Sequence, residues 1–448
     1  MPDKIAFSSD DVVNKAFSFI HLQYCKEAAF LWRRRFKVVD APYFSFHDLM
    51  ELDERMVAQL SGLSLSGLSG WEVAFDAWRQ FSDPSDWFVA AYHYFCVMGV
   101  DKGLPDFDDF LGYYLQGLTH EKIKAMRAAS LWVPEEHRAA IDRFIAHLNL
   151  CRETEARVLA LVLRSDKMDF ESLRSDDDLK AVMTLADDAN PEQLEWIMQV
   201  IAQEKAVLCQ PLVSRCLRDS NPLVAFSATI AQVFLSPEAS LPYLARFAQN
   251  PNCYQAKALD LWMRLMPIEH SQRVMSQLEI EPDSLLHIQA CAARGSVRDV
   301  PALLKHMNEE KVSRAAGEAF SLITGINLYQ NERFCVDHAL CCKQNRMALE
   351  RDQCDNSEDP FESLPWPNPA ALANWWQQQK DKFDQDGAYL CGKPRSRAAL
   401  YQLLKTGYQR QRHAAALCLN LCKGFKLSMS TAWPSARQRV FLDNLNCS

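Results

Sequence analysis

The sequence predicts an all-α protein, folded as an α-solenoid of short two-helix repeats with an irregular helical N-terminal region. Glycine supplies only 14 of the 448 residues, and a chain with few glycines and many alanines, leucines, glutamines and arginines favours helix over sheet. Four prolines stand at intervals of 31, 29 and 31 residues in the middle of the chain: Pro191, Pro222, Pro251 and Pro282. A period of about 30 residues is typical of a repeat array, in which each unit buries its apolar face on its neighbours.

Three of these prolines follow an asparagine, at Asn190, Asn221 and Asn250. Asparagine is a good helix N-cap, and a proline fits the first helical turn because its missing N–H would have no helical partner there. Each Asn-Pro pair therefore predicts the start of a helix, and the series predicts one such start per repeat.

Residues 1–130 are expected to form a helical N-terminal cap region with longer helices and more aromatic residues than the repeats. Apolar residues at spacings of three and four predict the first helix from about residue 11 to residue 36. Ser45, followed three residues later by Asp48, predicts the capping box of a second helix. A third helix follows two glycines, and Asp83-Pro84 predicts the start of a fourth.

The repeat solenoid is predicted over residues 131–342. One unit shows the pattern: a helix at about 210–218, a turn through Asn221-Pro222, and a second helix to about residue 235. Small residues along the second helices allow neighbouring helices to approach closely. Two-helix units of this size resemble short HEAT-like repeats, which are compact relatives of the longer HEAT unit.

The last part of the chain does not follow this period of about 30 residues. Residues 343–397 combine acidic residues, prolines and tryptophans, and such a stretch is too long for an ordinary connection between helices. We therefore predict an insertion there, with one short polar helix after its paired tryptophans. A final helical pair within residues 398–448 is expected to act as one more repeat and to close the stack.

Composition and charge narrow the functional classes. The formal net charge of −8 predicts no nucleic-acid partner, because such proteins usually carry a basic stripe. No stretch approaches the roughly 18 apolar residues of a membrane span, and the N-terminus lacks the apolar core of a signal peptide. Fifteen cysteines, an odd number at irregular spacings, suit a reducing compartment. We therefore expect a cytoplasmic protein without a membrane partner.

One group of soft ligands is the best candidate for a metal site: Cys335, His338, Cys341, Cys342 and Cys354. Zinc accepts this set of ligands. The spacing, however, is not that of a standard finger or ribbon, and paired C-x-x-C knuckles are absent. Buried or half-buried thiols are the preferred interpretation, so no metal and no other cofactor is predicted.

Catalysis finds little support in the sequence. None of the common nucleotide-binding, metalloprotease or serine-hydrolase motifs occurs, and the eleven histidines are scattered. Paired carboxylates, such as Asp108 with Asp109 and Asp187 with Asp188, stand at helix turns where capping explains them. We therefore predict that the protein is not an enzyme.

Three consecutive arginines form the sharpest positive patch of the chain: Arg33, Arg34 and Arg35. Consecutive residues fan around most of a helix, so these three do not form one stripe. A solvated end of the first helix is the simpler interpretation, and an anchor for an acidic partner is the alternative. All three are kept as candidate partner-binding residues.

Three tryptophans of the insertion are the second candidate: Trp366, Trp375 and Trp376. Trp366 stands between two prolines in a segment expected to be extended. Tryptophan is enriched at the energetic centres of protein interfaces. The rings either contact a partner or cover the open side of the last repeats, and both interpretations stay open at this point.

Several segments, in order along nearly the whole chain, resemble a family of uncharacterised bacterial HEAT-repeat proteins. They are EAAFLW (27–32), LDER (52–55), GWE (70–72), AAGEAFSLITG (315–325), LPWPN (364–368) with the paired tryptophans, and QRQRHAAA (409–416). The resemblance implies an α-solenoid without an assigned catalytic centre. It transfers no residue role to this chain.

Members of that family are often encoded beside components of type VI secretion: spike proteins, PAAR-like tips and toxic effectors. The resemblance therefore implies a cytoplasmic adaptor or chaperone that holds an effector or loads it on the spike. The partner would be a secretion effector, a spike protein or a tip protein. The alternative is an immunity protein, which binds and neutralises a cognate toxin.

Overall fold

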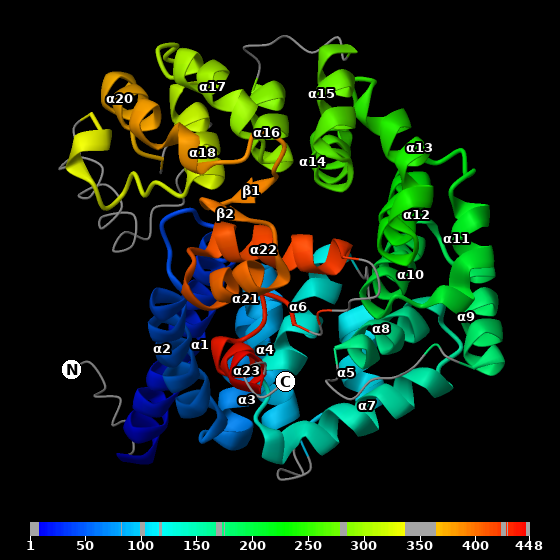
Figure 1. Ribbon diagram of the computed structural model, residues 1–448. Helices are drawn as coiled ribbons and strands as arrows, with labels where there is room; N and C mark the ends of the chain where they lie inside the picture. Colours follow the sequence, from blue (N-terminus) through cyan, green and yellow to red (C-terminus); the bar gives the residue numbers. More distant parts are fainter. Residues whose placement is uncertain are drawn as a thin grey trace. The chain divides into compact units, whose positions relative to one another are not determined.

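The computed structural model describes residues 9–81, 83–98, 104–115, 119–166, 173, 175–277, 285–336, 364–422, 427 and 429–444 (Figure 1). In these ranges regular structure is helical, apart from the two-residue strands β1 (Tyr389–Leu390) and β2 (Lys393–Pro394), which pair as a hairpin. The all-α prediction is confirmed. None of the described helices combines the length and apolarity that a membrane span needs.

The chain divides into two compact units. The first comprises Met1–Val39, His47–Ser227 and Ser428–Ser448, and the second comprises Asp40–Phe46 and Ala228–Leu427. The division falls inside one helix, α12 (Pro222–Leu235). The four-part organisation drawn from the sequence stays a prediction.

The first unit contains most helices of the N-terminal half and the last helix of the chain. They are α1 (Ser9–Val38), α2 (Phe46–Ser64), α3 (Gly67–Phe81), α4 (Pro84–Val97), α5 (Phe107–Leu115), α6 (His120–Trp132), η1 (Glu135–His137), α7 (Arg138–Leu150), α8 (Thr154–Ser165), α9 (Asp176–Asp188), α10 (Pro191–Glu204), η2 (Val207–Cys209), α11 (Gln210–Cys216) and α23 (Ser435–Asn444).

Packing in this unit passes from each helix to one close in sequence. Helix α4 packs on α3 and α6, α6 packs on α8, and α8 packs on α10. Aromatic side chains fill the core near its N-terminal end, as the sequence suggested: the rings of Tyr94 and Phe110 stack with centroids 3.9 Å apart, and Trp71 packs beside both.

The second unit contains the remaining helices and the hairpin. Its helices are α13 (Pro237–Ala248), α14 (Gln255–Leu265), α15 (Ile268–Gln277), α16 (Leu285–Arg294), η3 (Val297–Asp299), α17 (Val300–His306), α18 (Ser313–Thr324), η4 (Glu332–Phe334), α20 (Pro369–Gln379), η5 (Lys380–Lys382), α21 (Arg397–Thr406) and α22 (Gln409–Leu421). Helix α14 packs on α13 and α16, and α16 packs on α18.

The evenly spaced prolines begin helices at two of the four positions. Pro191 opens α10, where the side chain of Asn190 accepts the N–H of Gln193 in a capping box, and Pro222 opens α12. The helix predicted after Asn250-Pro251 also forms, as α14; it begins at Gln255, after a turn in which the Asn252 side chain accepts the N–H of Tyr254 at 2.8 Å. Pro282 lies outside the described residues.

Helix α18 organises the second unit, because several distant segments meet on it. Gly317 lets Pro367 approach so closely that an added Cβ would lie 3.1 Å from the proline ring. At the other end, Gly325 caps the helix with φ = 79°, a conformation that suits glycine. The β-hairpin then docks there, since the N–H of Cys391 donates to the carbonyl of Leu322 at 2.6 Å.

Candidate functional site

Arg35 is a structural residue of the first unit and does not present its charge to a partner. It is 6% exposed. Its guanidinium pairs with the Asp53 carboxylate, with Nε 2.7 Å from Oδ1, and donates to the carbonyls of Ala432 and Trp433. The prediction of an anchor for an acidic partner is therefore wrong for Arg35, because its guanidinium N–H groups donate to acceptors within the same unit.

The two neighbouring arginines differ from it. Arg33 is exposed and donates from Nη1 to the Ser85 hydroxyl at 2.9 Å, while Asp83 lies 3.6 Å away. Arg34 is half-buried. Partner binding by these two residues stays a prediction.

The paired tryptophans belong to the core of the second unit. Trp376 is 4% exposed and packs against the ring of Phe383, with centroids 5.4 Å apart. Trp375 is half-buried and meets the ring of Phe320 edge-on. Trp376 is therefore corrected from a partner contact to a core residue of the second unit, and contact between Trp375 and a partner stays a prediction.

The side chain of Trp366 is only partly covered by its neighbours. It is half-buried, and the Arg314 guanidinium lies over its ring at 4.8 Å from the centroid. Its neighbour Pro367 is buried against α18. Contact between Trp366 and a partner stays a prediction.

Of the proposed soft-ligand group, only Cys335 falls within the described residues. It is 5% exposed, and its thiol donates to the carbonyl of Leu328 at 2.8 Å. His338, Cys341, Cys342 and Cys354 lie outside the described residues.

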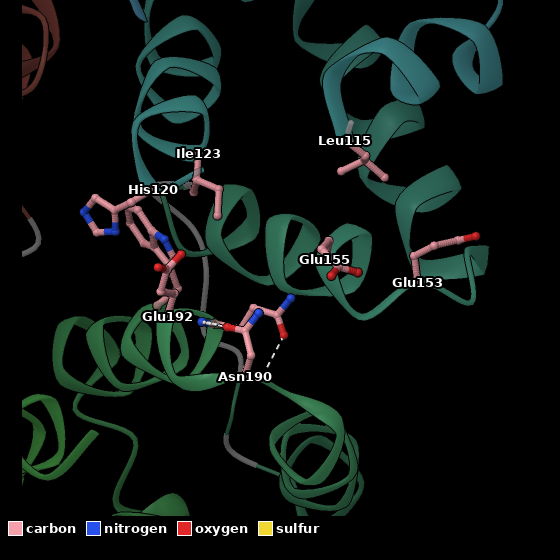
Figure 2. Close-up of a pocket in the computed structure, with 9 residues that line it drawn as sticks. Leu115, His120, Ile123, Glu153, Glu155, Asn190 and Glu192 are labelled. Atoms are coloured by element: carbon pink, nitrogen blue, oxygen red, sulfur yellow. Dashed lines mark hydrogen bonds between the residues drawn. The ribbon is translucent and has the colours of Figure 1, made fainter. Parts of the chain in front are cut away.

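A pocket of 340 Å³ lies within the first unit, at the start of three helices (Figure 2). Its walls come from the end of α5, the first turns of α6 and α10, and the residues that begin α8. The lining residues are Leu115, His120, Ile123, Glu153, Glu155, Asn190, Glu192, Gln193 and Trp196. Figure 2 shows that the labelled glutamates, Glu153, Glu155 and Glu192, belong to two separate helical segments.

Local sequence fixes these helix starts. Thr119 caps α6 by accepting the N–H of Lys122 through its hydroxyl, and Asn190 and Gln193 form the reciprocal capping box of α10. The side-chain oxygens of Asn190 and Gln193 thus accept backbone N–H groups. The pocket's remaining chemistry lies in its carboxylates and its ring pair.

Three carboxylates line the pocket: Glu153 and Glu192 are exposed, and Glu155 is half-buried. Lysine and arginine are absent from the lining residues. Each glutamate stands at or beside a helix N-terminus, where the helix dipole favours negative charge. The lining therefore presents a net negative surface.

The aromatic wall of the pocket is a stacked pair, the rings of His120 and Trp196, with centroids 4.5 Å apart and planes 28° apart. Burial lowers the pKa of His120, and nearby Lys124 acts in the same direction, against the carboxylate of Glu195. Because its ordinary pKa is about 6.5, the imidazole is neutral at pH 7. It adds no positive charge to oppose the glutamates.

Trp196 also carries an unused donor. The residue is 2% exposed, and its indole N–H has no hydrogen-bond partner within the described part of the chain. Buried donors are almost always paired, because an unmet N–H costs about 1–3 kcal/mol. The nitrogen has almost no accessible surface, so this donor lies beneath the pocket wall and is not presented to a molecule in the pocket.

Comparison with known proteins identifies no relative. No family model, no curated protein and no solved structure matches this chain. The resemblance to bacterial HEAT-repeat proteins stays an expectation.

Sequence reasoning did not single out the pocket residues. The sequence indicated Asn190 only as a cap, and paired carboxylates at helix turns were explained by capping. The sequence signal that could have indicated the pocket is a glutamate that recurs in the first turn of a helix. Glu155 and Glu192 each stand in the first turn of a helix, and those two helices, α8 and α10, pack on each other.

One other group of possible metal ligands lies within the described part of the chain. His47, Asp48 and Glu51 bring one ligand atom each within 4.8 Å of one another at the start of α2. The side chains of His47 and Glu51 are 78% and 67% exposed and pair with each other at 3.5 Å. An exposed helix start explains this group without a metal ion.

Glu318, on α18, is the most perturbed carboxylate of the second unit. Its side chain is 13% exposed, and its Oε1 lies 3.8 Å from Nη1 of Arg410. Burial raises its pKa from 4.5 to about 7; Asp40 adds to the rise and Arg410 opposes it. Charging this group therefore costs folding free energy.

Glu318 should make the second unit less stable as the pH rises. Its folded pKa exceeds the unfolded value, so its contribution is complete below about pH 4.5 and is lost as the pH passes about 7. Glu318→Gln should remove this loss and gain about 2–3 kcal/mol over wild type at pH 8. Urea unfolding at several pH values measures it. The exposed Glu310→Gln is the control, and equal behaviour of the two variants would contradict the assignment.

Proposed function

We propose that the protein is a non-catalytic scaffold for protein–protein interaction, built as an α-solenoid of short HEAT-like repeats. The observation that carries the proposal is the order of packing. In the first unit, contacts run from α4 to α6, α8 and α10, and in the second they run from α14 to α16 and α18. Every second helix thus meets the next member of the same series, as in repeat proteins, where each unit contacts its neighbours.

A scaffold of this kind has binding as its natural function. Repeat arrays present long surfaces, and a few buried aromatic and charged anchors supply most of the binding energy. The resemblance to bacterial HEAT-repeat proteins supports a more specific role. In that role the protein is a cytoplasmic adaptor or chaperone for a type VI secretion effector, or for its spike or tip protein.

An immunity protein is the second candidate. The observation that favours it is negative charge, both the net −8 of the chain and the carboxylates of the pocket. Immunity proteins bind one toxin tightly, often through complementary charge. A basic toxin would meet that requirement.

Affinity capture from the native host tests the adaptor role. The full chain, tagged at one end, should recover a secretion effector, a spike protein or a tip protein, and the purified pair should re-form a complex. Recovery of none of these would overturn the adaptor proposal. Gene deletion separates the two candidates: loss of an adaptor stops secretion of the effector, whereas loss of an immunity protein makes the cell sensitive to its sisters.

A further inference from the structure

We propose that the segment Asp40–Phe46 is a pH-sensitive strap, which stays docked on the start of α22 while Glu318 is protonated and is released when Glu318 ionises. The segment leads from α1 into α2 and belongs to the second unit. Its contacts with α22 and the largely buried position of Glu318 beside them carry the proposal. The device is local to the second unit and needs no partner protein.

The first two backbone amides of α22 are paired with the strap. The N–H of Gln409 donates to the carbonyl of Phe44 at 2.8 Å. The N–H of Arg410 donates to the carbonyl of Ala41 at 3.2 Å. Because the first amides of a helix find no acceptor within the helix itself, these two depend on the strap for their hydrogen bonds. Release of the strap would expose both amides even if α22 stayed folded.

Side chains of the strap favour the docked position. Ala41, Pro42 and Phe44 are buried, and removing apolar side chains from water stabilises the docked strap. The guanidinium of Arg412 lies over the ring of Phe46, at 4.0 Å from the ring centroid. These contacts do not change with pH near neutrality, so a pH-dependent release needs a titrating group next to the strap.

Arg410 connects the strap to that group, which is Glu318 of α18. Its Nε donates to the carbonyl of Asp40 at 3.3 Å, and its Nη1 lies 3.8 Å from Oε1 of Glu318. Within the described residues, the charged or titratable groups that interact with Glu318 are Arg410 of α22, Asp40 of the strap and Cys391 of the hairpin. Burial, helped by Glu318, raises the pKa of the Cys391 thiol to about 12, so this thiol carries no charge near pH 7.

Docking of the strap and protonation of Glu318 support each other. In the docked state burial raises the pKa of Glu318 from 4.5 to about 7, and Asp40 adds to the rise. Release removes the Asp40 carboxylate, admits water and frees Arg410 from the Asp40 carbonyl, and each change favours the ionised carboxylate. Protonation therefore supports docking fully below about pH 4.5, and this support is lost as the pH rises through about 7. Between pH 6 and pH 8 the equilibrium constant for release should rise about five- to tenfold.

Hydrogen exchange of the full-length protein tests the strap, measured at residue resolution by mass spectrometry and corrected for the intrinsic effect of pH on amide exchange. The opening constant at the amides of Gln409 and Arg410 should rise by the stated factor between pH 6 and pH 8. The N–H of Arg412 donates to the Tyr408 carbonyl within α22, so its protection should change much less. Equal changes at all three amides would mean that α22 or the whole unit opens, and would overturn the strap.

Variants connect the release to Glu318. Glu318→Gln cannot ionise, so the opening constant at Gln409 and Arg410 should be the same at pH 6 and pH 8 and should stay near the wild-type value at pH 6. The matched control, Glu310→Gln, removes an exposed carboxyl group of the same unit and should keep the wild-type pH dependence. Opening that still rises with pH in Glu318→Gln, or that does not change with pH in the wild-type protein, would overturn the inference.

Discussion

Replacing Arg35 with alanine is expected to destabilise the first unit by about 3–5 kcal/mol, because the change leaves a buried carboxylate without its counter-ion. Asp53 is 3% exposed, and its remaining described donor is the N–H of Ser435 at 2.7 Å. The carbonyls of Ala432 and Trp433 lose a donor at the same time. Urea unfolding monitored by circular dichroism measures the effect.

Arg33→Ala is the matched control, because Arg33 is two residues away and exposed. It should cost no more than about 1 kcal/mol, as for other surface ion pairs. Replacing both Arg35 and Asp53 by apolar residues should recover much of the loss, since no buried charge is then left unpaired. Equal small losses for Arg35→Ala and Arg33→Ala would contradict the buried position of Arg35.

Trp376→Ala is expected to destabilise the second unit by about 3–5 kcal/mol, the usual cost of removing a large buried aromatic side chain. The ring is 4% exposed and lies in one core cluster with Leu372 and Tyr389. Its removal leaves a cavity that the surrounding α20, η5 and hairpin residues cannot fill without moving. Thermal and urea unfolding of the full chain measure the loss.

Trp366→Ala is the comparison for this change. Trp366 is half-buried, so its removal should cost clearly less than that of Trp376. If Trp366 contacts a partner, the variant should stay folded and lose partner affinity. A Trp376→Ala protein with wild-type stability and reduced partner binding would reverse the assignment of that ring to the core.

Local signals predicted much of the fold. Asp83-Pro84 and Asn190-Pro191 mark helix starts because capping and the fixed φ of proline act within one turn. After Asn250-Pro251 the helix begins later, at Gln255. There, Asn252 forms its own turn and delays the helix, which is a competition between two local hydrogen-bonding patterns that the dipeptide alone does not decide.

Whether an individual side chain is buried or exposed was not predictable from the sequence, because residues far away along the chain decide it. Arg33 and Arg35 stand two residues apart in one helix, and only Arg35 meets carbonyls that lie almost 400 residues later in the chain. Trp375 and Trp376 are adjacent, and the turn of α20 directs only the second fully into the core. Residue type and local spacing are the same in both cases, so only tertiary packing separates them.

The pocket was invisible in the sequence for a related reason. Its residues come from segments centred near 120, 154 and 192, and each glutamate has a sufficient local explanation as a partner of its own helix dipole. Only the packing of α6, α8 and α10 in series brings these residues together around one pocket. The buried indole N–H of Trp196 has no local signature at all.

Affinity capture with the full-length protein from the native host tests the central claim most directly, that the protein is a scaffold for protein–protein interaction. The protein should recover a secretion effector, a spike protein or a tip protein, and the purified pair should re-form a complex. Recovery of none of these would contradict the account.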